Sequence, residues 1–117
     1  MTDTVRSTDR YEKQRAVPRY SFVATIELTD PVHAIRLTGR VTEISRYGCY
    51  VDTLNTFPVG TLLHLEISCD QGKFNTKARI VYIHAGIGMG IAFTDTAENQ
   101  MRVLESWLSA LPATAEI

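Results

Sequence analysis

The chain has 117 residues, of which 44% are hydrophobic and 21% charged, a composition that fits one small globular domain and excludes a wholly disordered chain. Twelve Lys and Arg against 13 Asp and Glu give a formal net charge of −1, which excludes binding to nucleic acid or anionic lipid through a general excess of positive charge. The charge is uneven, because residues 1–46 carry eight Lys and Arg against six Asp and Glu whereas residues 47–117 carry four against seven, so we expect an anionic ligand to bind the N-terminal part.

Residues 1–14 are polar and charged, and we expect them to form a flexible arm outside the core. The sequence contains neither a signal peptide nor a stretch long enough to span a membrane, so we expect a cytoplasmic protein without membrane insertion. Two separated cysteines, Cys49 and Cys69, are too few for a disulfide scaffold or a closed zinc site. Cys49 alternates with apolar neighbours, which favours a small buried hydrophobe over a reactive thiol.

From residue 20 to residue 93, apolar and polar residues alternate with the two-residue period of β-strands. The alternation predicts six strands, at about residues 20–29, 35–42, 48–52, 62–67, 74–83 and 89–93. In the fifth strand, Tyr82 falls on the same side as Phe74 and Ile80. In the second, Ile44 has the opposite parity from Val41, so we expect a β-bulge or turn near residues 42–45.

The period changes to three or four residues at the C-terminus, which predicts an amphipathic helix. Its apolar stripe comprises Met101, Leu104, Leu108 and Leu111, widened by Val103, Trp107 and Ala110. Asp95 and Glu98 have the spacing of a capping box at the start of this helix, and we expect Pro112 to stop it. Six strands followed by one helix predict a mainly β fold, a six-stranded antiparallel small β-barrel whose C-terminal α-helix covers an open end or face.

Nothing in the sequence indicates catalysis, a cofactor or a metal site. The histidines His33, His64 and His84 are scattered and match no metal-binding spacing, and Ser45 lacks the context of a nucleophilic serine. The glycines of Gly86–Gly90 lead into a strand instead of a helix, so we expect them to allow tight turns and close strand crossing rather than phosphate binding. An enzyme is therefore the least expected class.

Two arginines, Arg15 and Arg19, stand four residues apart at the entrance to the first strand. Pro18 disfavours helical geometry at Val17, so the pair lies on a bent or extended hinge. A guanidinium can pair with two oxygens of a phosphate or with the O6/N7 edge of guanine, and it can stack on a base. Taken alone, such a pair is more often a solvated surface cluster.

A second polar segment, Glu43–Gly48, lies where the strand parity changes. Glu43 and Ser45 are two residues apart on an extended chain and point to the same side, and Gly48 lets the backbone turn or approach a ligand closely. A carboxylate can accept hydrogen bonds from N1–H and N2–H of guanine, and a serine hydroxyl can serve a phosphate or a base. An ordinary turn between strands with a polar face would give the same pattern.

In this order and spacing, the two segments resemble the PilZ domain family, with ExSxxG standing where the family has [D/N]xSxxG. Gly90–Phe93 is also similar to the G-[IV]-x-F stretch before the family's helix. The resemblance extends over about residues 10–111 and implies a PilZ-like domain at 15–111, with 112–117 as a short tail. It implies a bacterial second-messenger receptor that binds cyclic di-GMP on the outer face of the barrel and does no chemistry.

The resemblance also implies which residues contact cyclic di-GMP. They are Arg15, Arg19, Glu43, Ser45, Arg46 and Gly48. The two arginines would bind phosphate and the Hoogsteen edge of guanine while stacking on bases, and Gly48 would permit close approach. Glu43 departs from the family's Asp or Asn and sets its oxygens about one methylene further out, which affects affinity more than fold. The charge of Arg46 would offset part of that loss.

The resemblance thus implies a stand-alone cyclic di-GMP receptor without an output domain. Ligand would order the N-terminal arm for an unidentified partner protein in motility, biofilm or polysaccharide control. The alternative is a PilZ-fold interaction adapter that has lost ligand binding, which Glu43 makes credible. A third class, an oligonucleotide-binding barrel, needs a basic face with exposed aromatics. The acidity of residues 47–117 argues against it, so no DNA or RNA partner is expected.

Overall fold

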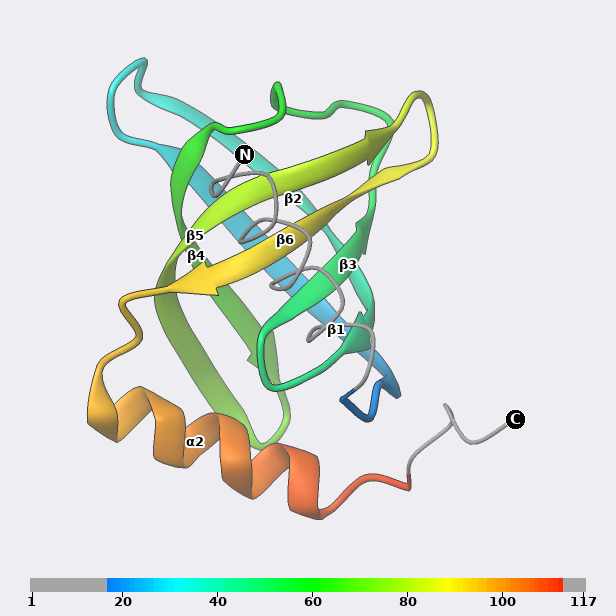
Figure 1. Cartoon of the computed structure of the whole chain (residues 1–117), viewed down its shortest axis with the longest axis vertical. Helices are drawn as coiled ribbons and strands as arrows, with labels where there is room; N and C mark the ends of the chain where they lie inside the picture. The colour runs from blue at the N-terminus through cyan, green and yellow to red at the C-terminus, as the bar shows by residue number, and fades with distance from the viewer. Residues whose placement is uncertain (1–16, 113–117) are drawn as a thin grey trace, which may run out of the picture.

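The computed structural model describes residues 17–112, which form a closed barrel with a helix across one end (Figure 1). The elements are β1 (Tyr20–Asp30), β2 (Ile35–Ile44), β3 (Gly48–Asp52), β4 (Leu62–Cys69), β5 (Gly72–His84), β6 (Gly88–Thr94) and α2 (Glu98–Ser109). The strands follow one another around the barrel in the order β1-β2-β3-β6-β5-β4, and β4 pairs back onto β1. Every pairing is antiparallel. The predicted six-stranded barrel with a C-terminal helix is confirmed for the described residues.

The core fills the inside of the barrel with the apolar side chains that the two-residue period assigns to one face. Ile26, Leu65 and Ile67 are completely buried on β1 and β4, and Phe74 and Ile80 are completely buried on β5. Burial of each such side chain stabilises the fold by about 1.5–3 kcal/mol. The barrel is therefore held by its interior, which leaves the outward side chains available for other roles.

The expected change of parity in the second strand is a β-bulge. The register of β2 against β3 shifts between Val41 and Glu43, so that Thr42 is the extra residue. Because of this shift Val41 and Ile44 are both buried, although their spacing is odd. A second bulge, which the alternation did not predict, lies in β5 between Ile80 and Tyr82.

The helix α2 packs against the barrel through two buried residues, Leu104 and Trp107. The Trp107 ring lies 5.5 Å from the ring of Phe22 and 6.2 Å from that of Phe74, measured between centroids. The helix ends at Ser109, and Pro112 follows its C-cap, Ala110, by two residues. No helix within residues 17–112 is long and apolar enough to cross a membrane.

The predicted capping box is wrong. The helix begins at Glu98 with Ala97 as its N-cap and no side-chain capping bond, and Asp95 has a φ of 48°. The next residue, Thr96, contacts β5, because its hydroxyl lies 2.7 Å from that of Thr76. The start of the helix therefore has a tertiary contact with β5 beside it but no local side-chain cap.

Candidate functional site

A shallow pocket of about 60 Å³ lies on the outside of the barrel, where β2, β3, β5 and β6 run side by side. Its lining includes Arg19, Glu43, Ser45 and Gly48 on one side and Tyr50 and Tyr82 on the other. Enclosed sites for drug-sized ligands measure about 300–1,000 Å³. A ligand of nucleotide size must therefore lie across this surface instead of inside it.

The charged part of the pocket is an ion pair between Arg19 and Glu43. Arg19 directly precedes β1, and β1 pairs with β2 so that Ser21 lies opposite Glu43. The Arg19 Nη1 donates to Oε1 of Glu43 at 3.3 Å, and the two side chains are 37% and 41% exposed. An ion pair with this exposure contributes about 0–1 kcal/mol to stability. Arg15, the other member of the RxxxR pair, lies outside the described residues.

Ser45 and Gly48 form the tight turn between β2 and β3. The Ser45 backbone N–H donates to the Gly48 carbonyl at 2.8 Å, and the Ser45 hydroxyl accepts from the Tyr47 N–H at 3.2 Å. Ser45 is buried, and its hydroxyl also lies 3.4 Å from the Gly48 carbonyl. In this structure Ser45 stabilises the turn that follows Glu43 at the end of β2.

Gly48 permits a close approach between two strands. It lies opposite Ala92 in the pairing of β3 with β6, and a Cβ at this position would collide with the carbonyl oxygen of Ile91. The absent side chain thus faces β6. From the sequence, Gly48 was expected to permit the close approach of a ligand. The close contact that the structure describes is with the backbone of β6.

Arg46 is placed away from the pocket. Its Nη2 lies 2.6 Å from Oε2 of Glu105, so that the ion pair joins the β2–β3 turn to α2. Arg46 is not among the residues that line the pocket. The structure therefore brings Arg19, Glu43, Ser45 and Gly48 together but leaves Arg46 with the helix.

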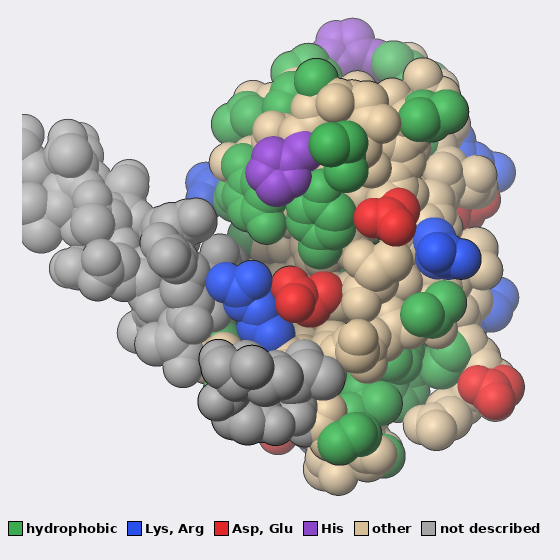
Figure 2. All heavy atoms as spheres, turned by 90° about the vertical axis from the view of Figure 1, so that its right-hand side faces the viewer, with side chains coloured by type: hydrophobic (Ala, Val, Ile, Leu, Met, Phe, Trp, Pro, Cys, Tyr) green, Lys and Arg blue, Asp and Glu red, His purple; other side chains and the backbone are tan. Residues whose placement is uncertain are grey.

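Aromatic side chains on the other side of the pocket were missed in the sequence. Tyr50 lies opposite Glu43 in the register of β2 with β3, and both Tyr50 and Tyr82 lie opposite Gly90 of β6. Figure 2 shows a histidine among hydrophobic side chains on this face, with a basic and an acidic side chain in contact beside them. Tyr50 could have been identified from the sequence, because the two-residue alternation places its side chain on the outside of the barrel. Tyr82 could not, because the bulge in β5 turns it from the expected inner face to the outer one.

Two groups that line the pocket have shifted acidities. Burial, together with the charge of Asp52, raises the pKa of the Tyr50 hydroxyl above its ordinary value of 10.0. Burial raises the pKa of the Cys49 thiol to about 12. The prediction that Cys49 is a small buried hydrophobe is confirmed, and its thiol is not a nucleophile at neutral pH.

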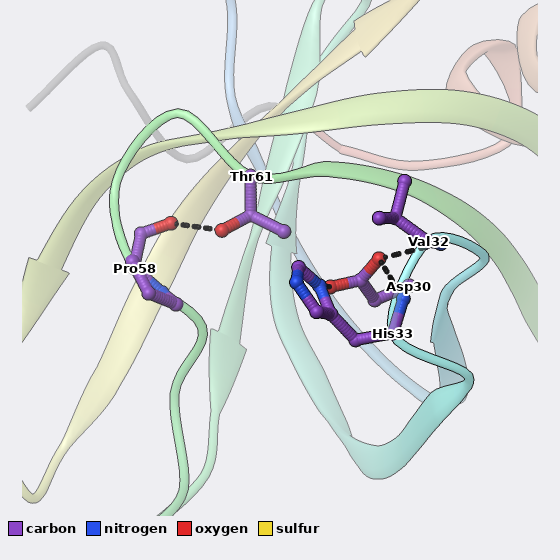
Figure 3. Close-up of polar contacts among 5 residues, drawn as sticks. All are labelled: Asp30, Val32, His33, Pro58 and Thr61. Carbon is purple, nitrogen blue, oxygen red and sulfur yellow. Dashed lines mark hydrogen bonds and ion pairs between the residues drawn. The ribbon is translucent and has the colours of Figure 1, made fainter.

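A separate polar cluster closes the β1–β2 turn, at the end of the barrel away from α2 (Figures 1 and 3). The buried Asp30 accepts hydrogen bonds from the backbone N–H groups of Val32 and His33 at 2.9 and 3.2 Å, and its other oxygen lies 2.8 Å from Nδ1 of His33. These bonds, led by the one to the His33 ring, lower the pKa of Asp30. The cluster satisfies a buried carboxylate and contributes nothing to the pocket.

The sequence matches the PilZ domain family over residues 10–110. Among solved structures, the PilZ domain of CeSA from a cellulose-synthesizing bacterium is 19% identical at a TM-score of 0.61, and the match covers 79% of this chain and 95% of that one. The PilZ domain of YcgR from Escherichia coli, solved with c-di-GMP, is 16% identical at a TM-score of 0.69, with 82% and 89% covered. The inhibitor of motility MotI/DgrA from Bacillus subtilis is 16% identical at 0.66, with 81% and 49% covered.

No curated protein matches the chain by sequence. At identities below 20%, the structural likenesses carry the fold, and they agree with the barrel and helix described above. The sequence match spans most of the chain, including both the hinge arginines and the ExSxxG segment. The chain belongs to the PilZ domain family.

Proposed function

We propose that this protein is a receptor that binds cyclic di-GMP on the outside of its barrel without converting it chemically. The observation that carries the proposal is the pocket that gathers Arg19, Glu43, Ser45 and Gly48, the described members of the two motifs. The PilZ domain of YcgR, which has the same fold, was solved with c-di-GMP.

The Arg19–Glu43 pair offers both kinds of group that guanine requires. A guanidinium donates to the O6/N7 edge of the base or to a phosphate, and a carboxylate accepts from N1–H and N2–H. The two groups lie side by side at 3.3 Å. A ligand with two guanines and two phosphates can therefore engage both members of the pair while the arginine keeps the carboxylate and the phosphates from repelling each other.

We further propose that Arg15 completes the site from the N-terminal segment. In this proposal both arginines clamp one ligand, and the ordering of residues 1–14 against the barrel presents a new surface to a partner protein. Arg46 takes no direct part, because its charge is held by Glu105 on α2.

Titration calorimetry with cyclic di-GMP tests the proposal in wild type, Arg15→Ala and Arg19→Ala. Each substitution removes a charged hydrogen bond worth about 1.5–3 kcal/mol, so we expect affinity to fall about ten- to a hundredfold. Arg102→Ala is the matched control, since that arginine is exposed on α2 and pairs only loosely with Glu98. We expect it to bind like the wild type.

Unchanged affinity in both hinge variants would contradict the assignment. A wild type that produces no heat with excess ligand would instead favour the second candidate, an interaction adapter with the PilZ fold that does not bind cyclic di-GMP. The observation in favour of that candidate is that Glu43 already engages Arg19.

A further inference from the structure

Three aromatic rings gather on the outer face beyond the Arg19–Glu43 pair: Tyr50 of β3 and Tyr82 and His84 of β5. Their centroids are 6.2 Å apart for the two tyrosines, 5.7 Å for Tyr50 and His84, and 5.3 Å for Tyr82 and His84. We refer to these three residues as the aromatic cluster. The tyrosines are half-buried and the histidine is exposed. The core inside the barrel does not need them, so their grouping calls for another explanation.

Two glycines in the strand beneath the aromatic cluster leave room for its tyrosine rings. The strand β6 runs between β3 and β5 and carries Gly88 and Gly90. A Cβ at Gly90 would collide with the Tyr82 ring, and one at Gly88 would press on the Tyr50 ring and on the Val51 carbonyl. The two tyrosine rings therefore pack on β6 at positions where it has no side chains, Tyr82 on Gly90 and Tyr50 on Gly88.

The cluster continues the charged part of the pocket along one row of paired residues across the strands. Glu43, Tyr50, Gly90 and Tyr82 are successive partners across β2, β3, β6 and β5. Neighbouring strands are about 4.8 Å apart, so the row spans about 14 Å. Stacked rings have centroids about 4.5–7 Å apart, so a base stacked on the cluster and a second base at Arg19 and Glu43 occupy separate places along it.

We propose that Tyr50, Tyr82 and His84 form a stacking subsite for a purine base, next to the site of Arg19 and Glu43. The inference deepens the proposed function and rests on it, because the same ligand would fill both places. Aromatic side chains bind bases through their faces, with little dependence on sequence.

A polar edge adds a hydrogen-bond donor to this subsite. The Tyr50 hydroxyl lies 2.9 Å from Nδ1 of His84. When the hydroxyl donates, the neutral imidazole carries its proton on Nε2, which is then a donor. Purine N7 and guanine O6 are acceptors of that kind. In that arrangement the subsite combines stacking with one donor for an acceptor atom on the edge of the base.

Calorimetry with cyclic di-GMP provides the first test, on Tyr82→Ala, Tyr82→Phe, His84→Ala and Leu62→Ala. Loss of one stacking ring should weaken binding about five- to a hundredfold in Tyr82→Ala, whereas Tyr82→Phe keeps the ring and should bind like the wild type. Leu62→Ala also truncates an exposed apolar side chain but lies outside the pocket, so it should have no effect. Circular dichroism establishes that each variant is folded, and His84→Ala, at an exposed position, should lose affinity as well.

A second measurement separates this inference from the proposed function. Ring resonances of Tyr50 and Tyr82 are followed by NMR while 5′-GMP or ribose 5-phosphate is added to the wild type. Stacking predicts shifts with 5′-GMP and none with the sugar phosphate.

If cyclic di-GMP binds but Tyr82→Ala and His84→Ala bind it like the wild type, the subsite is wrong and the receptor assignment stands. If cyclic di-GMP does not bind, the receptor assignment fails, and ring shifts with 5′-GMP support the subsite while their absence overturns it.

Discussion

At the scale of single residues, Glu43 decides how much positive charge the pocket presents. Its carboxylate reaches Arg19, so the guanidinium is partly neutralised before any ligand arrives. A ligand phosphate that pairs with Arg19 must share or displace this contact. Relative to the Asp or Asn of the family motif, Glu43 has one additional methylene, and in this structure its carboxylate pairs with Arg19.

Glu43→Asp should therefore tighten binding of cyclic di-GMP. The shorter carboxylate withdraws from Arg19, and release of a part-exposed pair worth up to about 1 kcal/mol predicts a gain of about two- to fivefold, largest at low salt. Calorimetry at two salt concentrations measures it. Glu98→Asp, at the exposed start of α2, is the control. Weaker binding by Glu43→Asp would show that the longer side chain is needed.

The residues of the candidate site could be predicted from the sequence where they belong to a local motif. Arg19, Glu43, Ser45 and Gly48 were predicted, and the structure brings all four to one pocket. Arg46 was also predicted, but its position depends on Glu105, which is 59 residues away in the sequence. A contact over that distance leaves no pattern in the sequence.

At the scale of elements, the strands were predictable because each has one buried face, and that imposes a period of two. Bulges break this link between sequence and side-chain direction. The bulge after Val41 was visible as a change of parity, but the bulge in β5 was not. Tyr82 was consequently placed with the core residue Ile80, and the aromatic cluster was missed.

The β1–β2 turn should make stability sensitive to acid. The pKa of Asp30 is lowered in the folded state, so its contribution is complete above the ordinary value of 3.8 and is lost as the pH falls through the lower, folded value. The free energy of unfolding, measured by urea denaturation between pH 6 and pH 2.5, should therefore fall in the wild type below pH 3.8.

Two variants of that turn separate its parts. Asp30→Asn should remove this share of the pH dependence. His33→Ala should reduce it only in part, because the backbone N–H groups still donate to the carboxylate. An identical acid profile in Asp30→Asn and the wild type would contradict the role given to this carboxylate.

At the scale of the whole molecule, α2 is part of the barrel's core. Trp107 is 3% exposed and packs between the rings of Phe22 and Phe74. Trp107→Ala should lower the free energy of unfolding by about 3–5 kcal/mol, as for other buried aromatic residues. Glu105→Ala, on the same helix, removes only the exposed pair with Arg46 and should cost at most about 1 kcal/mol. Both values come from chemical denaturation followed by circular dichroism, and equal losses would mean that the helix is held by charge.

Closure of the barrel restricts how another protein can recognise this one. Each of the six described strands is hydrogen-bonded to a neighbour on both sides over part of its length, so the edges that a foreign strand could join are short stretches such as residues 35–39 of β2, which lie beyond the pairing with β3. A protein that bound the barrel would therefore contact mainly its outward side chains and loops. The same closure leaves little strand edge through which two copies of the barrel could pair.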